Sequence, residues 1–134
     1  MAAGYSGTPP AKKLGIKEGT VLALVGAPTG WAVPGLPARV TERSSLRGRF
    51  DVAVVFVRSA ADLRRKADPV ARATADEASV WIAWPRKAGG HDSDVTENLL
   101  RGVLLPTGLV DVKVAAIDED WSGLKFVRRK ELRG

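Results

Sequence analysis

The segment FDVAVVFV, residues 50–57, is an almost continuous run of β-branched and other apolar residues that ends in Arg58-Ser59. Thr20–Val25 and Ser79–Trp84 are built in the same way and end in the turns Gly26-Ala27-Pro28 and Pro85-Arg86-Lys87. Such runs are typical of strands covered on both faces, as in a parallel α/β sheet. Ligands of these sheets bind beyond the carboxyl ends of the strands, so the three turns mark the expected site.

Two segments that follow strands carry helix signals. Ser59 predicts a helix over Ala60–Lys66, and the proline in Asp68-Pro69 predicts a kink or a restart that runs to about residue 77. Asp94-x-x-Glu97 resembles a capping box and predicts a second helix. The apolar face of that helix would carry Val95, Leu99, Leu100, Val103 and Leu104.

The remaining expected elements are short. Thr8 before Pro9-Pro10 predicts a helix over Pro9–Leu14, because threonine caps helices and proline suits their first turn. Ala38–Thr41 is expected as a second strand and Glu42–Arg49 as a loop. A closing antiparallel hairpin is expected from Leu109–Ile117 and Leu124–Val127, linked through Trp121-Ser122-Gly123.

This order of elements predicts an α/β fold with a mixed, mostly parallel sheet, flanking helices and a C-terminal antiparallel hairpin. We expect a single domain over residues 1–134, with a flexible arm over residues 1–8 and a basic tail over residues 128–134. The order resembles a reduced class I methyltransferase fold, a Rossmann-like architecture whose sheet also ends in a hairpin. The predicted core comprises Val21, Leu22, Leu24, Val52, Val54, Val55, Phe56, Val80, Ile82, Leu100, Val112, Val114 and Leu124.

Three blocks of sequence carry a second resemblance, which covers nearly the whole chain. The blocks are residues 6–17 (SGTPPAKKLGIK), residues 81–87 (WIAWPRK) and residues 105–114 (LPTGLVDVKV), the last followed by Asp118-Glu119 and by residues 121–125 (WSGLK). Together they resemble a family of small bacterial proteins of unknown function, largely actinobacterial. That resemblance implies no activity and assigns no catalytic residue.

The composition excludes several classes of function. The chain has no cysteine, which excludes disulfides, thiol catalysis and cysteine-ligated metal sites. No apolar stretch reaches the roughly 18 residues that span a bilayer, and Met1–Pro10 lacks the apolar core of a secretory signal. We therefore expect a cytoplasmic protein that makes no membrane contact.

Charge is unevenly distributed along this basic chain, whose formal net charge is +6. Residues 39–66 carry eight Arg and Lys against three Asp and Glu, whereas residues 67–124 carry five against ten. Residues 125–134 are basic again, with five against one. Basic segments attract anions or nucleic acid, although they are more often simply solvated. Few aromatic residues lie among them to stack on bases, so nucleic-acid binding has little support.

The predicted ligand site lies at the carboxyl edge of the sheet. Gly26-Ala27-Pro28-Thr29-Gly30 follows the first strand where nucleotide-binding folds place a glycine-rich turn, but it has neither the G-x-G-x-x-G fingerprint nor a P-loop. It is either a tight turn or a degenerate adenosyl or phosphate cradle, with Glu42 as the candidate ribose acceptor. Arg86 and Lys87 at the same edge suit an anionic ligand. The predicted site residues are Gly26, Ala27, Pro28, Thr29, Arg58, Trp84, Arg86 and Lys87.

Other chemistry-bearing residues form no recognisable motif. His91 is the single histidine and is expected as an exposed loop residue, with metal ligation or general-base chemistry as the alternative. Asp118-Glu119-Asp120 is expected as a hairpin turn, because consecutive strand residues do not converge on one ion. Ser59, Ser93 and Ser122 lack the G-x-S-x-G context of a hydrolase nucleophile. The sequence therefore predicts no catalytic and no metal-binding residue.

Three functions stay open at this point. The first is a non-catalytic binding or interaction module with an anionic small molecule or a protein as partner. The alternatives are a small enzyme that binds a nucleotide or adenosyl ligand, and a basic nucleic-acid-binding protein. The cofactor and the oligomeric state are left open. Trp121 is expected either to be buried against the N-terminal helix or to serve in a homodimer or partner contact.

Overall fold

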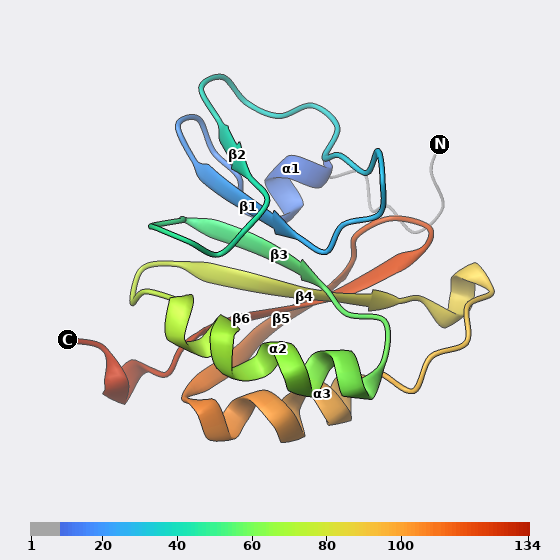
Figure 1. The fold of residues 1–134 in the computed structure, drawn as a ribbon. Helices are drawn as coiled ribbons and strands as arrows, with labels where there is room; N and C mark the ends of the chain where they lie inside the picture. The colour runs from blue at the N-terminus through green and yellow to red at the C-terminus, as the bar shows by residue number, and fades with distance from the viewer. Residues whose placement is uncertain (1–8) are drawn as a thin grey trace.

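The computed structural model describes residues 9–134, so the predicted arm and the capping role of Thr8 lie outside the described residues. Six strands form one sheet in the order β2-β1-β3-β4-β6-β5 (Figure 1). They are β1 (Val21–Val25), β2 (Thr41–Arg43), β3 (Val52–Phe56), β4 (Ser79–Pro85), β5 (Leu109–Ala116) and β6 (Trp121–Arg128). The first four pair in parallel, and β6 runs antiparallel to β4 and β5 on either side of it. The predicted mixed, mostly parallel sheet with a closing hairpin is confirmed.

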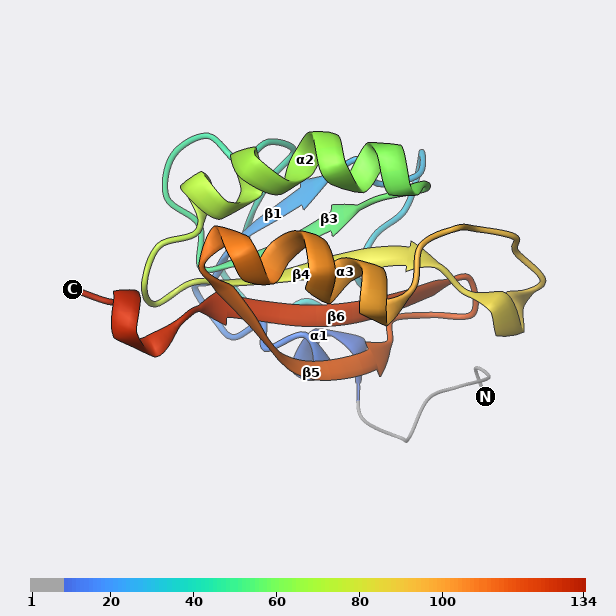
Figure 2. The same cartoon turned by 90° about the horizontal axis from the view of Figure 1, so that it is seen from below.

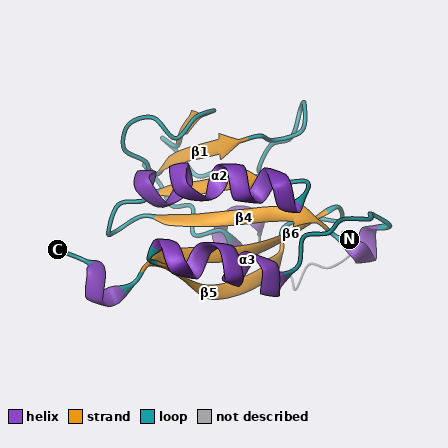
Figure 3. Ribbon diagram, turned by 60° about the horizontal axis from the view of Figure 1, so that its bottom comes forward, coloured by secondary structure: helices purple, strands orange, loops and turns teal. Residues whose placement is uncertain are grey.

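The helices cover the two faces of the sheet unequally. Helices α2 (Ala60–Ala73) and α3 (Glu97–Leu104) lie side by side on one face, and the short α1 (Pro10–Lys13) lies on the other (Figures 2 and 3). We call these faces the helical face and the α1 face. Single 3₁₀ turns complete the chain: η1 (Lys87–Gly89), η2 (Leu105–Thr107) and η3 (Lys130–Leu132).

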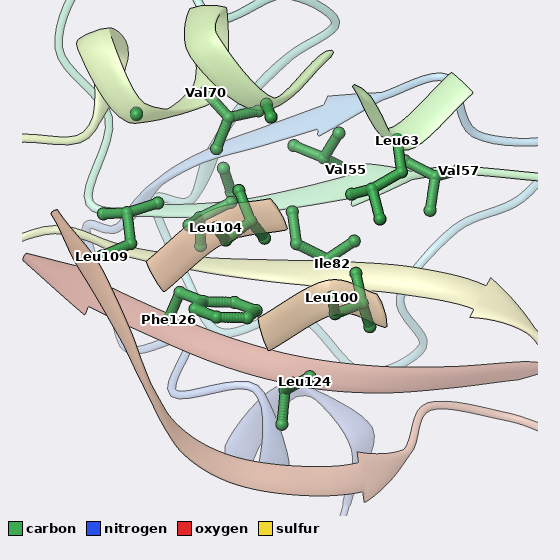
Figure 4. Close-up of a cluster of buried hydrophobic side chains, with 14 of the residues drawn as sticks. Val55, Val57, Leu63, Val70, Ile82, Leu100, Leu104, Leu109, Leu124 and Phe126 are labelled. Carbon is green, nitrogen blue, oxygen red and sulfur yellow. The ribbon is translucent and has the colours of Figure 1, made fainter. Parts of the chain in front are cut away.

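A core fills the space between the sheet and the helical face. Alternate strand residues such as Val55 and Ile82 point toward it, because successive side chains of a strand leave opposite faces of the sheet (Figure 4). Leu63 of α2 and Leu100 of α3 meet them from the other side (Figure 4). Burying large apolar side chains of this kind contributes about 1.5–3 kcal/mol each relative to leaving them exposed.

A second core lies on the α1 face and is rich in aromatic residues. Phe56 contacts Trp121 edge-on at a centroid distance of 4.9 Å, and the indole of Trp81 donates a hydrogen bond to the carbonyl of Leu14 at 3.1 Å. Trp121 is 8% exposed, which confirms its predicted burial, and Ala11 of the N-terminal helix belongs to the same cluster.

Two expectations for the helices, a restart at Asp68-Pro69 and a cap at Asp94, are wrong, and the expected kink stays a prediction. Helix α2 continues through Pro69, because this proline lies on the solvent face, where water can satisfy the carbonyl that loses its N–H partner. Thr96, not Asp94, caps α3, and its side chain accepts from the Leu99 N–H at 3.1 Å. Asp94 instead accepts from the Ala60 N–H at 2.8 Å, at the start of α2. The predicted cap at Ser59 is confirmed.

Three expectations for the strands also need correction. The expected link Trp121-Ser122-Gly123 belongs to β6, and residues 117–120 form the hairpin turn instead. The second strand is Thr41–Arg43 and takes in part of the expected loop, because Arg39 adopts a φ of +61° that interrupts an extended chain. Val112 and Val114 are 53% and 54% exposed rather than buried. They lie on the edge strand β5, where a register shift between Asp111 and Lys113 disturbs the regular alternation.

The first residue of the predicted basic tail belongs to the folded sheet. Arg128 is the last residue of β6, and its guanidinium donates to the carbonyls of Ala71 and Thr74 at the end of α2. Of the predicted core, Val21 and Leu24 are half-buried, the two valines of β5 are exposed, and every other member is buried.

Candidate functional site

The strand order reverses between β1 and β3, because the chain goes from β1 to β2 on one side and then crosses to β3 on the other. Open α/β sheets bind ligands in the crevice outside the carboxyl ends of the strands at such a switch point. Here the turn at Gly26, after β1, and Arg58, after β3, lie on either side of this switch point. The fold thus brings two of the predicted site residues to the position that sheets of this type use.

Gly26 fits its position for two reasons. Its φ of +73° is one that residues with a side chain rarely adopt, and a Cβ there would lie 3.2 Å from the Phe56 carbonyl oxygen. That Cβ would also lie 3.0 Å from the ammonium of Lys66, which donates to the same carbonyl at 2.7 Å and lies 3.3 Å from the Asp62 carboxylate. The switch point therefore has an ammonium, paired with the Asp62 carboxylate, directly behind a glycine turn.

A first hollow of about 440 Å³ opens between the ends of β1 and β2. Leu24 and Glu42 line it, and the guanidinium of Arg43 donates to the carbonyl of Arg47 at 3.2 Å. Register places Glu42 opposite Leu22, whose side chain is buried on the α1 face. The lining residues are Leu24, Gly26, Ala27, Trp31, Glu42, Arg43 and Ser44.

An aromatic row separates this hollow from its neighbour. Trp31 contacts Phe56 at a centroid distance of 4.8 Å, and Phe56 in turn contacts Trp121 at 4.9 Å, both in edge-to-face geometry. The indole N–H of Trp31 donates to the Asp118 carboxylate at 2.9 Å, which fixes the ring. The row gives each hollow one aromatic wall.

A second hollow of about 300 Å³ lies across that row, at the ends of β3, β4 and β6. The guanidinium carbon of Arg58 lies 5.4 Å from the centroid of the Trp121 ring, within the range of a cation–π contact. His91 and Asp120 form the opposite wall, with 2.9 Å between Nε2 and Oδ1. Pro85 completes the lining.

The pairing of His91 with Asp120 is the feature that sequence reasoning missed. His91 is exposed, as predicted, and it has a carboxylate partner 29 residues away in the chain. The signal that could have revealed it is Gly89-Gly90 before the histidine, since two glycines allow close approach of one loop to another. Asp118 forms the hairpin turn as predicted, accepting from the backbone N–H groups of Asp120 and Trp121 at 2.8 Å each.

The structure distributes the predicted site residues over different surroundings. Gly26 and Ala27 line the first hollow, and Arg58 lines the second. Trp84 is buried in the core of the helical face and lines neither hollow. Pro28 and Thr29 lead from the glycine turn to Trp31, whose N–H bonds to the Pro28 carbonyl at 2.9 Å.

The cations after β4 differ in their surroundings. Arg86 is tied to the β5–β6 turn: its N–H donates to the Asp120 carbonyl at 2.8 Å, and its side chain donates to the Asp118 carbonyl at 3.4 Å. Lys87 is exposed at the start of η1. Arg86 therefore stabilises the β5–β6 turn, which forms one wall of the second hollow. The role of Arg86 and Lys87 in anion binding stays a prediction.

Residues 9–134 hold neither a cluster of metal-ligating side chains nor a membrane-spanning helix. Nowhere in this part of the chain do three or more His, Asp or Glu side chains gather in a way that could hold a metal ion. Among these residues no helix is long and apolar enough to cross a membrane. A third hollow of about 320 Å³, between α1 and residues 30–34, is lined mainly by apolar residues and carries no titratable side chain apart from Asp118.

Comparison with known proteins shows the fold. No protein-family model and no curated protein sequence matches this chain. A solved structure of ribosomal protein L11 methylase from Lactobacillus delbrueckii subsp. bulgaricus superposes with a TM-score of 0.58 at 12% identity, covering 90% of this chain and 75% of that one. A mutant of MtNAS in complex with S-adenosylmethionine superposes with a TM-score of 0.55 at 12% identity, covering 89% of this chain and 58% of that one. A protein of the NADB-Rossmann superfamily from Streptococcus agalactiae superposes with a TM-score of 0.51 at 11% identity, covering 95% of this chain and 71% of that one. The chain thus has the Rossmann-like architecture of class I methyltransferases, as the order of its elements predicted.

Proposed function

We propose that this protein binds an adenosyl ligand of the S-adenosylmethionine class in the first hollow. The observation that carries the proposal is that Glu42 and the turn at Gly26 line the same hollow beside the switch point. A carboxylate accepts hydrogen bonds from the vicinal hydroxyls of a ribose, and a glycine lets a ligand approach the backbone closely. Trp31 offers an aromatic surface for an adenine ring.

The absence of a helix after β1 favours an adenosyl ligand over a nucleotide. Dinucleotide-binding folds place the pyrophosphate at the N-terminus of the helix that follows the first strand, where free N–H groups and the helix dipole stabilise negative charge. In this protein residues 26–40 form turns and no helix. Pro28 also lacks an N–H that could face a phosphate. The first hollow therefore offers a ribose acceptor without a phosphate cradle.

The charge at the switch point suits the amino-acid end of such a ligand. Lys66 holds its ammonium behind Gly26, where it pairs with Asp62, and Arg43 is among the residues that line the hollow. A carboxylate close to these cations would be stabilised, and its attraction would be stronger where water is partly excluded. The solved complex of MtNAS with S-adenosylmethionine, which shares the fold, supports the same ligand class.

The expectation of a non-catalytic interaction module finds no support in the comparisons, and the adenosyl alternative accounts for them better. Nucleic-acid binding through the basic segments stays a prediction, whose signature would be an affinity that falls steeply with salt.

Calorimetric titration with S-adenosylmethionine, S-adenosylhomocysteine and ATP tests the proposal. We expect saturable binding of the two adenosyl compounds and weaker binding of ATP. Glu42→Gln should lower adenosyl affinity at least tenfold, because hydrogen bonds to a charged group are worth about 1.5–3 kcal/mol. Glu77→Gln, at the opposite edge of the sheet, is the matched control and should bind as the wild type does. Equal affinity in both variants would disprove the assignment of Glu42.

A further inference from the structure

The second hollow has a construction of its own, and the adenosyl proposal does not use it. Two loops that lie about thirty residues apart meet there, at the carboxyl end of β4 and at the β5–β6 turn (Figures 1 and 2). Their backbones are joined by the hydrogen bond from Arg86 N–H to the Asp120 carbonyl, 2.8 Å long. This contact holds the two walls of the hollow in register.

Close packing fixes the position of His91. A Cβ on Gly89 would lie 2.4 Å from the Glu119 carbonyl oxygen, so the 3₁₀ turn η1 fits against the hairpin turn because this residue is glycine. Gly90 then adopts a φ of +84° and redirects the chain. The His91 N–H bonds back to the Arg86 carbonyl at 3.4 Å. The conformation of residues 89–91 therefore places His91 within hydrogen-bond distance of Asp120.

The carboxylate partner defines which ring nitrogen of His91 is available. An ionised Asp120 can only accept, so Nε2 carries the proton that it donates across the 2.9 Å contact. Nδ1 of the neutral imidazole then keeps a free lone pair. A histidine oriented by a carboxylate in this way can accept a hydrogen bond, or a proton, from a hydroxyl group.

Arg58 provides the complementary charge. Its backbone is fixed from two sides, since its N–H donates to Asp62 at 3.1 Å and its carbonyl accepts from the Ser93 hydroxyl at 3.2 Å. Its guanidinium lies over the Trp121 ring and makes no ion pair with any residue between 9 and 134. A planar guanidinium with free donors is suited to bind a carboxylate in two-point fashion.

We propose that the second hollow binds a small planar carboxylate that also carries a hydroxyl group, with the carboxylate on Arg58 and the hydroxyl on His91. Pro85 and Trp121 supply apolar walls for a flat ring between these two polar ends. A volume of about 300 Å³ is at the small end of ligand pockets, which suits a single ring. Asp120 acts as a positioning residue, because its carboxylate orients the imidazole of His91.

Titration of the protein with 4-hydroxybenzoate and with benzoate, followed in ¹H–¹⁵N NMR spectra, tests this proposal. We expect saturable shifts at His91, Trp121 and the backbone after β3, with affinity for 4-hydroxybenzoate about fivefold higher, the equivalent of one net hydrogen bond. Arg58→Gln should weaken both compounds at least tenfold, whereas Arg64→Gln, an exposed arginine of α2 outside the hollow, should leave both affinities unchanged.

Variants of His91 and of its partner Asp120 measure how much the histidine contributes to the preference for the hydroxyl compound. His91→Phe keeps a planar ring without a nitrogen, so we expect it to bind both compounds equally well. Asp120→Ala should lose most of the preference for the hydroxyl compound while benzoate binding stays the same, which a purely structural role would not produce. Absence of binding at the second hollow, or a hydroxyl preference that survives in His91→Phe, would overturn the proposal. Adenosyl binding by these variants is measured separately, so a failure of either proposal is recognised independently of the other.

Discussion

The indole nitrogen of Trp31 and the carboxylate of Asp118 are joined by a hydrogen bond of 2.9 Å, although the two residues are 87 positions apart in the chain. This bond ties the turns after β1 to the β5–β6 hairpin across the α1 face. The same carboxylate accepts from the N–H groups of Asp120 and Trp121. One side chain therefore organises the aromatic wall of the first hollow and the turn that carries Asp120 into the second.

Asp118→Ala should lower the free energy of unfolding by about 1–3 kcal/mol, because it leaves partly buried donors without an acceptor. The neighbouring Glu119→Ala is the control: Glu119 is exposed, and its removal should change stability by less than about 0.5 kcal/mol. Denaturant unfolding of both variants measures the difference. Equal stability would show that the Asp118 network is dispensable.

Two glycines should respond to alanine in opposite directions. Gly89→Ala should be destabilising, because the new Cβ would collide with the Glu119 carbonyl, and it should displace His91 from Asp120. Gly102→Ala in α3, where a Cβ meets nothing within 4 Å, should raise stability by about 0.5–1 kcal/mol. Thermal unfolding of the pair checks the prediction, and the His91 ring signals in NMR spectra report its displacement. A neutral Gly89→Ala would contradict the close packing of the two loops.

Arg128 closes the end of α2 from the neighbouring strand. Its guanidinium donates to the carbonyls of Ala71 and Thr74, two of the groups that a helix end leaves unpaired. We expect Arg128→Met to cost about 1–3 kcal/mol of unfolding free energy, whereas Lys130→Met, at an exposed residue, should cost almost nothing. If chemical denaturation gives the same midpoint for both variants, residues 128–134 act merely as the solvated tail that the sequence predicts.

A valine pair tests the corrected core. Val54 of β3 is fully buried, and replacing it by threonine places a hydroxyl in apolar surroundings at a cost of about 1–3 kcal/mol. Val114→Thr should be neutral within about 0.5 kcal/mol, since Val114 lies exposed on the edge strand. Urea unfolding distinguishes the two. A large loss at Val114 would mean that β5 is covered in solution.

The parallel part of the sheet could be predicted because its signal is local. Residues 52–57 are all buried, and a strand covered on both faces needs apolar residues at every position. The exposure of Val112 and Val114 could not be predicted in this way, since it depends on which strand lies at the edge. Strand order is set by the crossovers, and the alternation within Leu109–Ile117 is the same for an inner strand as for an edge strand.

In the candidate site, too, the features that follow from local sequence could be predicted, and those that depend on contacts between distant loops could not. The glycine turn and Arg58 could be placed at the carboxyl edge because each directly follows a strand. The pairing of His91 with Asp120 depends on two loops that meet in space, and neither loop has a motif that names its partner. The sequence predicts Trp84 as a site residue, but its side chain belongs to the helical-face core, whereas Trp81 belongs to the core of the α1 face.

Titration of the wild-type protein with S-adenosylhomocysteine, observed in ¹H–¹⁵N NMR spectra, tests the central claim most directly. Binding in the first hollow predicts saturable shifts at Gly26, Ala27 and Glu42 and at the indole N–H of Trp31, with the amides of residues 86–91 unchanged. Spectra that do not change at millimolar ligand, or shifts confined to the second hollow, would contradict it.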